Sequence, residues 1–456
     1  MKAFDAIIVG AGQAGPSLAG RLTAAGNTVA LVERDRVGGT CVNTGCTPTK
    51  ALVASAYAAH LARRAGDYGI GTGPVTVDFP AVIARAQGIA TKSRQNNEAW
   101  LAGMPGLTLI RGHARFTSPT TMTIDGEAIT APRIFLNVGG RPSRPVMPGS
   151  DQVRLLTNEE MLKLDTLPAH LVVVGGSYIG LEFAQMFRRF GSRVTIVEMS
   201  PRLIAREDPE ISEAIRTMLE AEDIAVRTDA TCIAFALADS GVAVGVDCTE
   251  GEPQVVGTHV LLAVGRTPNT DDLGLDMAGV AIGKHGFITV DDHLATNVPG
   301  IWALGDCNGR GAFTHTAYND FEIVAANLLD GTDRRVGQRL PGYALYTDPP
   351  LGRVGLTEAQ ARASGRSLLV STRPMTRVAR AIEKGETVGL MKIVADAETR
   401  KVLGAAILGT GGDEAIHGIL DMMHADQSLD TLRWAVPIHP TVSELIPTLL
   451  LDLKPA

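Results

Sequence analysis

The chain of 456 residues is poor in aromatic side chains and has no concentrated positive charge. Aromatic residues make up 4% of it, and the formal net charge is −7, with no run of lysine and arginine. Nucleic-acid-binding proteins usually carry a basic patch, so we expect no nucleic-acid partner. No apolar stretch approaches the roughly 20 residues that span a bilayer, and the first residues lack the regions of a signal peptide. We therefore expect a cytoplasmic protein without membrane association.

Cysteine is also scarce, with five residues in the chain. An odd number in a cytoplasmic protein argues against a framework of structural disulfides. Cys41 and Cys46 lie only five positions apart, and such a close pair is typically redox-active or metal-binding. The other three, Cys232, Cys248 and Cys307, have no close partner in sequence, and we expect them to be small buried side chains.

Glycine, by contrast, is abundant at 50 residues, which indicates many tight turns between strands and helices. The length predicts two to four domains. An internal repeat relates residues 5–35 to residues 170–200 with a constant offset of 165. Each copy reads as a buried strand, a glycine turn, a helix and a second strand that ends in an acid, which is a βαβ unit. Two such units predict two Rossmann-like dinucleotide-binding domains.

The first glycine turn has the GxGxxG spacing, with Gly10, Gly12 and Gly15. These glycines allow a tight turn, close approach of a pyrophosphate and close packing of helix on strand. The phosphate would lie at a helix N-terminus, where free N–H groups favour an anion. Glu33 ends the second strand, where a carboxylate can accept hydrogen bonds from a ribose. The segment therefore predicts a dinucleotide site.

The second repeat carries Gly175 and Gly180 at the corresponding positions, and Glu198 at its end. Glu198 can hold the ribose hydroxyls of NADH, whereas it repels the 2′-phosphate of NADPH. One charge pair at ~5 Å with an effective dielectric constant of ~20 costs about 3 kcal/mol, before solvent screening. Arg202 and Arg206 are the nearby cations that could offset this repulsion. We expect NADH to be preferred over NADPH.

The most specific signal is the run GGTCVNTGCTPTK at residues 38–50, which contains Cys41 and Cys46. Positions five apart at the start of a helix lie near one face, so a strained disulfide can close there. A thiolate near a helix N-terminus has a lowered pKa and is reactive. A metal site would need further Cys or His ligands close by, and none follows, so we expect no metal centre. Two buried free thiols are the alternative.

This run resembles the active-site motif of the class I FAD-dependent pyridine nucleotide-disulfide oxidoreductases, which include dihydrolipoyl dehydrogenase, glutathione reductase and mercuric reductase. The similarity covers the whole chain, since YIGLE, GRTPNT, VPGIWALGD and HPTVSE follow in the family's order. It implies an α/β fold with Rossmann-like domains for FAD and NAD and a C-terminal α+β dimerisation domain. The expected parts are residues 1–147 for FAD, 148–268 for NAD(P), 269–340 for a second FAD-binding or central part, and 341–456 for dimerisation.

The resemblance implies an enzyme that passes electrons from a nicotinamide, through FAD, to a disulfide of Cys41 with Cys46. Cys41 would exchange with substrate, and Cys46 would face the flavin as a thiolate. Lys50 and Glu182 look like the ion pair beside the flavin, and Tyr178 looks like the ring that covers it until nicotinamide displaces that ring. Further cofactor-binding positions that the family implies are Gly39, Thr40, Gly265 and, at the flavin ribitol, Asp306.

The C-terminal run HPTVSE resembles the segment that holds the family's catalytic base. His439 would accept and donate the thiol proton, and Glu444 would orient the ring and strengthen it as a base. In the family this segment dimerises, so we expect a homodimer in which His439 acts in trans on the partner's cysteines. His315, just after the flavin-binding turn, is a further candidate to approach the flavin.

The terminal acceptor stays open between a small-molecule disulfide, such as lipoamide, and another oxidant. Runs such as TDPPLGRVGLTEAQAR resemble the mercuric-reductase-like subgroup, so a metal-ion or quinone reductase is the main alternative. The chain ends LLLDLKPA, without the C-terminal cysteine pair of mercuric reductase, and it lacks an N-terminal metal-carrier domain, which argues against mercury as the substrate. A non-enzymatic subunit of a lipoamide complex is a third possibility, which the complete set of site residues disfavours.

Overall fold

The computed structural model describes residues 1–247 and 251–456, apart from the side chain of Cys232. Cys248, which the sequence predicts to be buried, lies outside the described residues. The chain forms two compact units. Unit 1 comprises residues 1–51, 83–143 and 264–339, and unit 2 comprises residues 52–82, 144–263 and 340–456. Residues 144–263 and 340–456 share unit 2 with residues 52–82, and the division into domains after residues 147, 268 and 340 stays a prediction.

Unit 1 is built on a five-stranded sheet whose neighbouring strands are all parallel. In spatial order the strands are β19 (Ile301–Ala303), β8 (Ile134–Leu136), β2 (Ala6–Val9), β3 (Val29–Glu33) and β4 (Leu107–Arg111). Every residue of β2 is buried, as expected for a central parallel strand that is covered on both faces. The first βαβ unit of the sequence is therefore confirmed.

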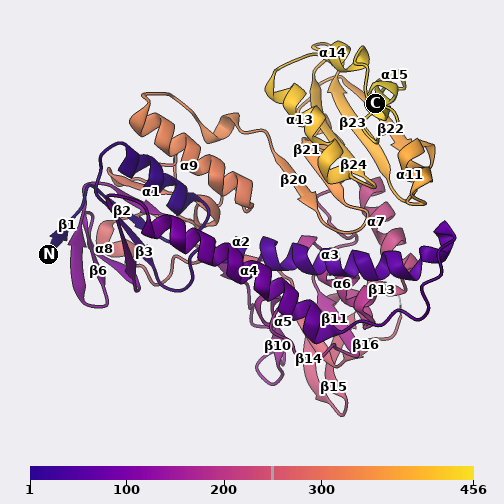
Figure 1. The fold of residues 1–456 in the computed structure, drawn as a ribbon, viewed down its shortest axis with the longest axis horizontal. Coiled ribbons are helices and arrows are strands. Elements are labelled where there is room, and N and C mark those ends of the chain that lie inside the picture. Colours follow the sequence, from indigo (N-terminus) through magenta and orange to yellow (C-terminus); the bar gives the residue numbers. More distant parts are fainter. Residues whose placement is uncertain (248–250) are drawn as a thin grey trace. The chain divides into compact units, whose positions relative to one another are not determined.

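Both faces of this sheet are covered, one by helices and one by a smaller sheet (Figure 1). The helices are α1 (Ala14–Ala24), α4 (Phe79–Ala102) and α9 (Thr314–Leu329), whose apolar residues share one core cluster. The second sheet has the order β1-β7-β6-β5 and packs Phe116 and Met122 against Ile7 of β2. Its strands are β1 (Lys2–Ala3), β5 (Ala114–Ser118), β6 (Thr121–Ile124) and β7 (Glu127–Thr130). A ladder of β9 (Gly140–Pro142) with β18 (Arg266–Pro268) completes the strands of unit 1.

Unit 2 contains the second parallel sheet, in the order β10-β17-β11-β12-β13. Its strands are β10 (Leu155–Leu156), β17 (His259–Leu262), β11 (His170–Val174), β12 (Arg193–Val197) and β13 (Ile224–Arg227). Helix α6 (Tyr178–Phe190) joins β11 to β12, as the repeat predicted, and α7 (Pro209–Ala221), which lies beyond the repeat, joins β12 to β13. A three-stranded antiparallel sheet, β14 (Thr231–Ala238), β15 (Gly241–Asp247) and β16 (Gln254–Gly257), packs beside it.

The C-terminal part of unit 2 is an α+β domain on a six-stranded antiparallel sheet (Figure 1). In spatial order the strands are β20 (Gly342–Leu345), β21 (Leu351–Gly355), β24 (Val402–Leu408), β23 (Leu390–Asp396), β22 (Leu368–Pro374) and β25 (Lys454–Pro455). Helices α13 (His417–His424) and α15 (Leu445–Leu451) contribute Ile419, Ile446 and Leu449 to its core. The predicted fold class is thus confirmed. Among the described residues, no helix combines the length and apolar character needed to cross a membrane.

Candidate functional site

The first glycine turn connects the carboxyl end of β2 to α1. Gly10 has a φ of +101°, and a Cβ on it would lie 2.3 Å from the carbonyl oxygen of Asn137. A Cβ on Gly15 would lie 2.3 Å from the carbonyl oxygen of Gly10. A Cβ on Gly12 would have its nearest neighbour, the Asn137 side-chain amide, at 3.2 Å. The turn itself therefore requires the outer two glycines, whereas the middle one leaves a surface against which another group can pack.

The acid at the end of each repeat is held by the backbone in the same way. Glu33 accepts the Ala11 N–H at 2.8 Å through Oε2, and through Oε1 it accepts the N–H two residues further along the chain at 2.8 Å. Glu198 accepts the Gly176 N–H at 2.5 Å and, likewise, the N–H two residues further on at 2.7 Å. The two copies of the sequence repeat therefore make equivalent hydrogen bonds. Both carboxylates lie at the carboxyl edge of a parallel sheet, where nucleotides bind in such folds.

The donor groups around the first turn fit the pyrophosphate and ribose of FAD. Among the described residues, α1 has no side-chain cap and no acid in its first turn, so its first N–H groups can receive an anion. Gly39 has a φ of +59°, and a Cβ on it would lie 2.9 Å from the Gly12 Cα, so this loop packs directly on the turn. Glu33 would supply acceptors for a ribose.

Arg266 contacts two residues that are expected at the flavin end of the site. Its Nε lies 3.6 Å from Asp306 Oδ2, and it donates to the Thr40 hydroxyl at 3.3 Å. Gly265, with a φ of +113°, precedes it in the chain. Burial raises the pKa of the Asp306 carboxyl, and the nearby guanidinium opposes that shift. The structure thus groups three of the expected cofactor positions around one cation that the sequence reasoning had not singled out.

The two cysteines belong to unit 1 and lie on consecutive helices. Cys41 belongs to α2 (Gly39–Asn43), and Cys46 is the first residue of α3 (Cys46–Arg63). Both are free thiols in this structure, and Cys46 is the more exposed. A helix N-terminus stabilises a thiolate through its free N–H groups and dipole, so the position of Cys46 favours its ionised form.

A hydrogen bond between the two thiols makes them unequal. It is the largest influence that lowers the pKa of Cys46, to about 6, and also the largest that raises the pKa of Cys41. The hydroxyl of Thr314, 3.3 Å from Cys46 Sγ, and the charge of Lys50 lower the pKa of Cys46 further. At neutral pH, Cys46 is therefore the thiolate, and Cys41 keeps its proton and donates to it.

In unit 2, Tyr178 and Glu182 lie one turn apart on α6. The Tyr178 ring meets the ring of Tyr343 edge to face, with centroids 5.4 Å apart and an interplanar angle of 81°. The Arg206 guanidinium lies 5.4 Å from the centroid of the same ring. Burial raises the pKa of Tyr178 to about 12. Lys50 belongs to unit 1, so its pairing with Glu182 stays a prediction.

His439 and Glu444 form a contact pair in the C-terminal domain. The Nδ1 atom of His439 lies 2.8 Å from Glu444 Oε2, and the histidine side chain is 75% exposed. With Nδ1–H donated to the carboxylate, Nε2 is left to exchange a proton. The preceding residues Trp434, Val436 and Ile438 are exposed by 77%, 96% and 80%, so the histidine is flanked by bare apolar side chains. Its action on the cysteines stays a prediction.

The sequence reasoning missed Thr314 and Tyr343. Thr314 begins α9 and contacts Cys46, whereas its neighbour His315, the residue considered for this region, stacks on Phe313 with ring centroids 5.4 Å apart. The signal that could have identified Thr314 was a hydroxyl side chain at the start of a helix, after the turn expected to bind the flavin. No sequence pattern near Tyr343 predicts its role, because its partners Tyr178 and Glu207 lie in a distant part of the sequence.

The chain is similar to a known protein family and to several proteins of established name. Residues 4–320 match the family described as pyridine nucleotide-disulphide oxidoreductase, and residues 342–450 match its dimerisation domain. Mercuric reductase of Streptomyces lividans is 36% identical, over 97% of this chain and 94% of that protein. Dihydrolipoyl dehydrogenase of Thermus scotoductus is 33% identical, over 97% and 96%. A solved Cu(II) complex of the HOCl-induced flavoprotein disulfide reductase RclA from Escherichia coli has a TM-score of 0.89 and 34% identity, over 98% of this chain and 99% of that one.

The chain therefore belongs to the pyridine nucleotide-disulfide oxidoreductase family, as its motifs predicted. It is an oxidoreductase of the flavoprotein disulfide reductase type, in which electrons pass from NAD(P)H through FAD to a redox disulfide. The C-terminal domain fits a homodimer. The comparisons do not favour the metal-ion or quinone reductase alternative.

Replacing Gly12 by alanine should weaken FAD binding while the fold persists. The added methyl would lie 3.2 Å from the Asn137 side-chain amide, a tight contact that a small shift of that side chain relieves, and it would occupy the surface expected to receive the pyrophosphate. We expect the FAD Kd to rise roughly 10- to 100-fold, the equivalent of about 1–3 kcal/mol for an overpacked contact. Flavin fluorescence during reloading of the apoprotein measures this. Gly20→Ala on α1, the helix that follows the turn, is the matched control, because its Cβ would make ordinary contact with Met104 at 3.5 Å. An unchanged Kd for Gly12→Ala would contradict the assignment.

Alkylation of Cys46 by iodoacetamide should titrate with a midpoint near pH 6, because the thiolate is the reacting form and the pKa is about 6. Cys41→Ala removes the hydrogen-bond donor and should move the midpoint to higher pH, and Thr314→Val should do so to a smaller extent. Mass spectrometry of the reduced, labelled protein locates the adduct. Cys307 is the internal control, since burial raises its pKa to about 12. A Cys41→Ala midpoint no higher than that of the native protein would show that the thiol pair is not coupled.

Proposed function

We propose that this chain reduces a small-molecule disulfide with NADH, and that Cys41 and Cys46 are the residues that exchange with it. The observation that supports this most strongly is the unequal thiol pair, in which Cys46 is a thiolate and Cys41 its protonated partner. Disulfide exchange needs one sulfur that attacks the substrate and a second that resolves the product, and an unequal pair supplies both. FAD, when bound, supplies the two-electron transfer between nicotinamide and disulfide.

The exchange balances as NADH + H⁺ + RSSR → NAD⁺ + 2 RSH. Cys41 Sγ attacks one sulfur of the substrate, breaks its S–S bond and releases the first thiol. Cys46 Sγ then attacks Cys41 Sγ, releases the second thiol and restores the disulfide of the pair. Because the pKa of Cys41 is raised, its attack requires a base, whereas Cys46 is already ionised at neutral pH. This difference is the reason that the mechanism needs a histidine.

His439 is the proposed base, and it would act on the cysteines of the other subunit. Its Nδ1 is occupied by Glu444 at 2.8 Å, which orients the ring and leaves Nε2 to take the proton of Cys41 and return it to the leaving thiol. The exposed apolar side chains before His439 support a second copy of the chain as the cover of this segment.

For the nucleotide, the arrangement around Glu198 supports NADH. Both carboxylate oxygens already accept backbone N–H groups, which holds the charge at the edge of the sheet where the adenosine ribose would lie. Arg206 lies against the Tyr178 ring, and Arg202 donates to the Ala205 carbonyl at 3.5 Å. Both candidate cations for a 2′-phosphate thus make contacts elsewhere.

A substrate screen tests the proposed reaction. NADH oxidation should be fastest with a disulfide among lipoamide, glutathione disulfide, cystine, Cu(II), Hg(II) and a quinone. Cys41→Ser should lower disulfide turnover roughly 1,000-fold or more, as when other enzymes lose a nucleophile. NADH-dependent dye reduction, which bypasses the thiols, should persist and serves as the control. Faster turnover of a metal ion or quinone than of every disulfide would favour the alternative reductase.

Nucleotide preference gives a second test. The native enzyme should have a higher kcat/KM with NADH than with NADPH. Glu198→Gln removes the repelling charge while retaining an acceptor oxygen, so the preference should fall by roughly tenfold or more, given about 3 kcal/mol of repulsion before screening. Steady-state rates with both nucleotides measure this. A native preference for NADPH would overturn the argument.

Mixing two inactive variants tests the trans arrangement. Cys41→Ser and His439→Ala homodimers should each lack disulfide turnover, whereas a heterodimer contains one site without either defect. After subunit exchange between equal amounts, about half of the dimers are mixed, so roughly a quarter of native activity should return. Native mass spectrometry verifies the heterodimer. Absence of activity with heterodimers present would place the histidine and cysteines of one site on one chain.

A further inference from the structure

Helix α6 presents one stripe of side chains to a short segment of the C-terminal domain, residues 343–348. The stripe consists of Tyr178, Glu182, Gln185 and Arg189, whose spacings of four, three and four place them on one helical face. All four contact the segment, as rings, hydrogen bonds or an ion pair. The stripe begins with Tyr178, the residue expected to cover the flavin. The segment is therefore in a position to control the movement of Tyr178.

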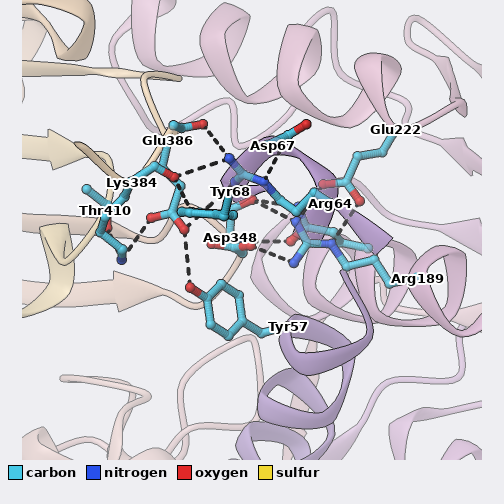
Figure 2. Close-up of polar contacts among 12 residues, drawn as sticks. Tyr57, Arg64, Asp67, Tyr68, Arg189, Glu222, Asp348, Lys384, Glu386 and Thr410 are labelled. Atoms are coloured by element: carbon cyan, nitrogen blue, oxygen red, sulfur yellow. Dashed lines mark hydrogen bonds and ion pairs between the residues drawn. The ribbon is translucent and has the colours of Figure 1, made fainter. Parts of the chain in front are cut away.

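The far end of the stripe is firmly anchored. Figure 2 shows Arg189 between Glu222 and Asp348, at 2.8 Å and 2.6 Å. Gln185 exchanges two hydrogen bonds of 2.8 Å with the backbone of Asp348. The Arg189 side chain is 5% exposed, so these are buried interactions with partners on both sides. They fix the register between α6 and the segment.

The near end of the stripe is anchored through Tyr343. Its ring meets Tyr178, and its hydroxyl donates to the carboxylate of Glu207. That carboxylate is fully buried and accepts Nε of Arg353 at 3.0 Å and its NH2 group at 2.5 Å. Arg353 also donates to Asp208 at 3.0 Å. The hydroxyl is therefore tied to a buried charge network, which leaves the Tyr343 ring little freedom to follow Tyr178 if that residue moves.

We propose that Tyr343 is a positioning residue that holds the ring of Tyr178 in its resting place and so sets the free energy that nicotinamide must supply to displace it. The proposal rests on the proposed role of Tyr178. The edge-to-face contact exists only while Tyr178 is at rest, because the network of Glu207 and Arg353 keeps Tyr343 in place. Breaking that contact opposes nucleotide binding. Removing it should therefore tighten binding.

The experiment measures the NAD⁺ Kd of the oxidised holoenzyme by calorimetry, together with KM and kcat for NADH. Tyr343→Leu removes the ring contact and should lower the Kd roughly 2- to 10-fold, the usual range for an aromatic pair. The KM should fall by a similar factor while kcat changes less. Tyr343→Phe retains the ring contact but loses the bond to Glu207 that keeps the ring in place, so its Kd should fall less than that of the leucine variant. If the leucine variant does not fold, Tyr343→Met replaces it.

Two further variants separate this inference from the proposed function. Tyr178→Ala should lower the Kd by itself, and in that background Tyr343→Leu should have no further effect, since the pair is already broken. A lowered Kd in Tyr178→Ala with an unchanged Kd in Tyr343→Leu overturns the inference alone. An unchanged Kd in Tyr178→Ala overturns the role of Tyr178 and the inference with it.

The matched control is Tyr68→Leu. Tyr68 belongs to the same unit, lies near the Arg64 guanidinium at 5.5 Å and donates its hydroxyl to the Lys384 carbonyl (Figure 2). Its substitution removes a comparable ring and hydroxyl without touching Tyr178, so the NAD⁺ Kd should not change. An equal fall in Kd for Tyr68→Leu and Tyr343→Leu would indicate general loosening of the unit and would overturn the inference.

Discussion

The hydrogen bond between the thiols of Cys41 and Cys46 is the interaction on which the chemistry of this protein depends. It places the negative charge on Cys46, at the start of α3, where the helix N-terminus, Thr314 and Lys50 also favour a thiolate. The same bond keeps the proton on Cys41. From this inequality follow the need for an external base and the order of the two proposed sulfur attacks.

The two nucleotide domains show how a duplicated turn can be retained while its surroundings diverge. Both copies keep a carboxylate that accepts two backbone N–H groups. In both, a Cβ on the last glycine, Gly15 or Gly180, would lie 2.3 Å or 2.0 Å from the carbonyl oxygen of the first glycine. Around the first copy, unit 1 adds the cysteine loop and Arg266 with its contacts to Thr40 and Asp306. Around the second, unit 2 adds Tyr178 and its neighbours. We expect the shared hydrogen bonds to serve nucleotide binding and the different additions to serve the chemistry.

The buried charged residues of unit 2 hold neighbouring side chains in fixed positions. Arg353, Glu207 and Asp208 have side chains that are at most 1% exposed, and desolvating such a group is unfavourable unless every partner is in place. Removal of one partner would leave a buried charge uncompensated. A network of this kind therefore tolerates little movement, which suits it to hold Tyr343 against a residue proposed to move. The anchoring of Arg189 by Glu222 and Asp348 follows the same principle at the other end of α6.

The sequence by itself determined the two βαβ units, the glycine turns, the acids that end each repeat and the cysteine pair, because these depend on residues close together in the chain. Strand burial, turn geometry and a thiolate at a helix start are local properties, so motif spacing predicts them. The family resemblance also brought His439 together with Glu444, five residues apart. Only the tertiary structure decided that Thr314 contacts Cys46, that Arg266 joins Thr40 to Asp306, and that Tyr343 meets Tyr178. Arg266 and Asp306 are 40 residues apart, and the partners in the other three contacts are more than 150 residues apart. Long-range packing rather than local pattern therefore selects which of many similar side chains come into contact.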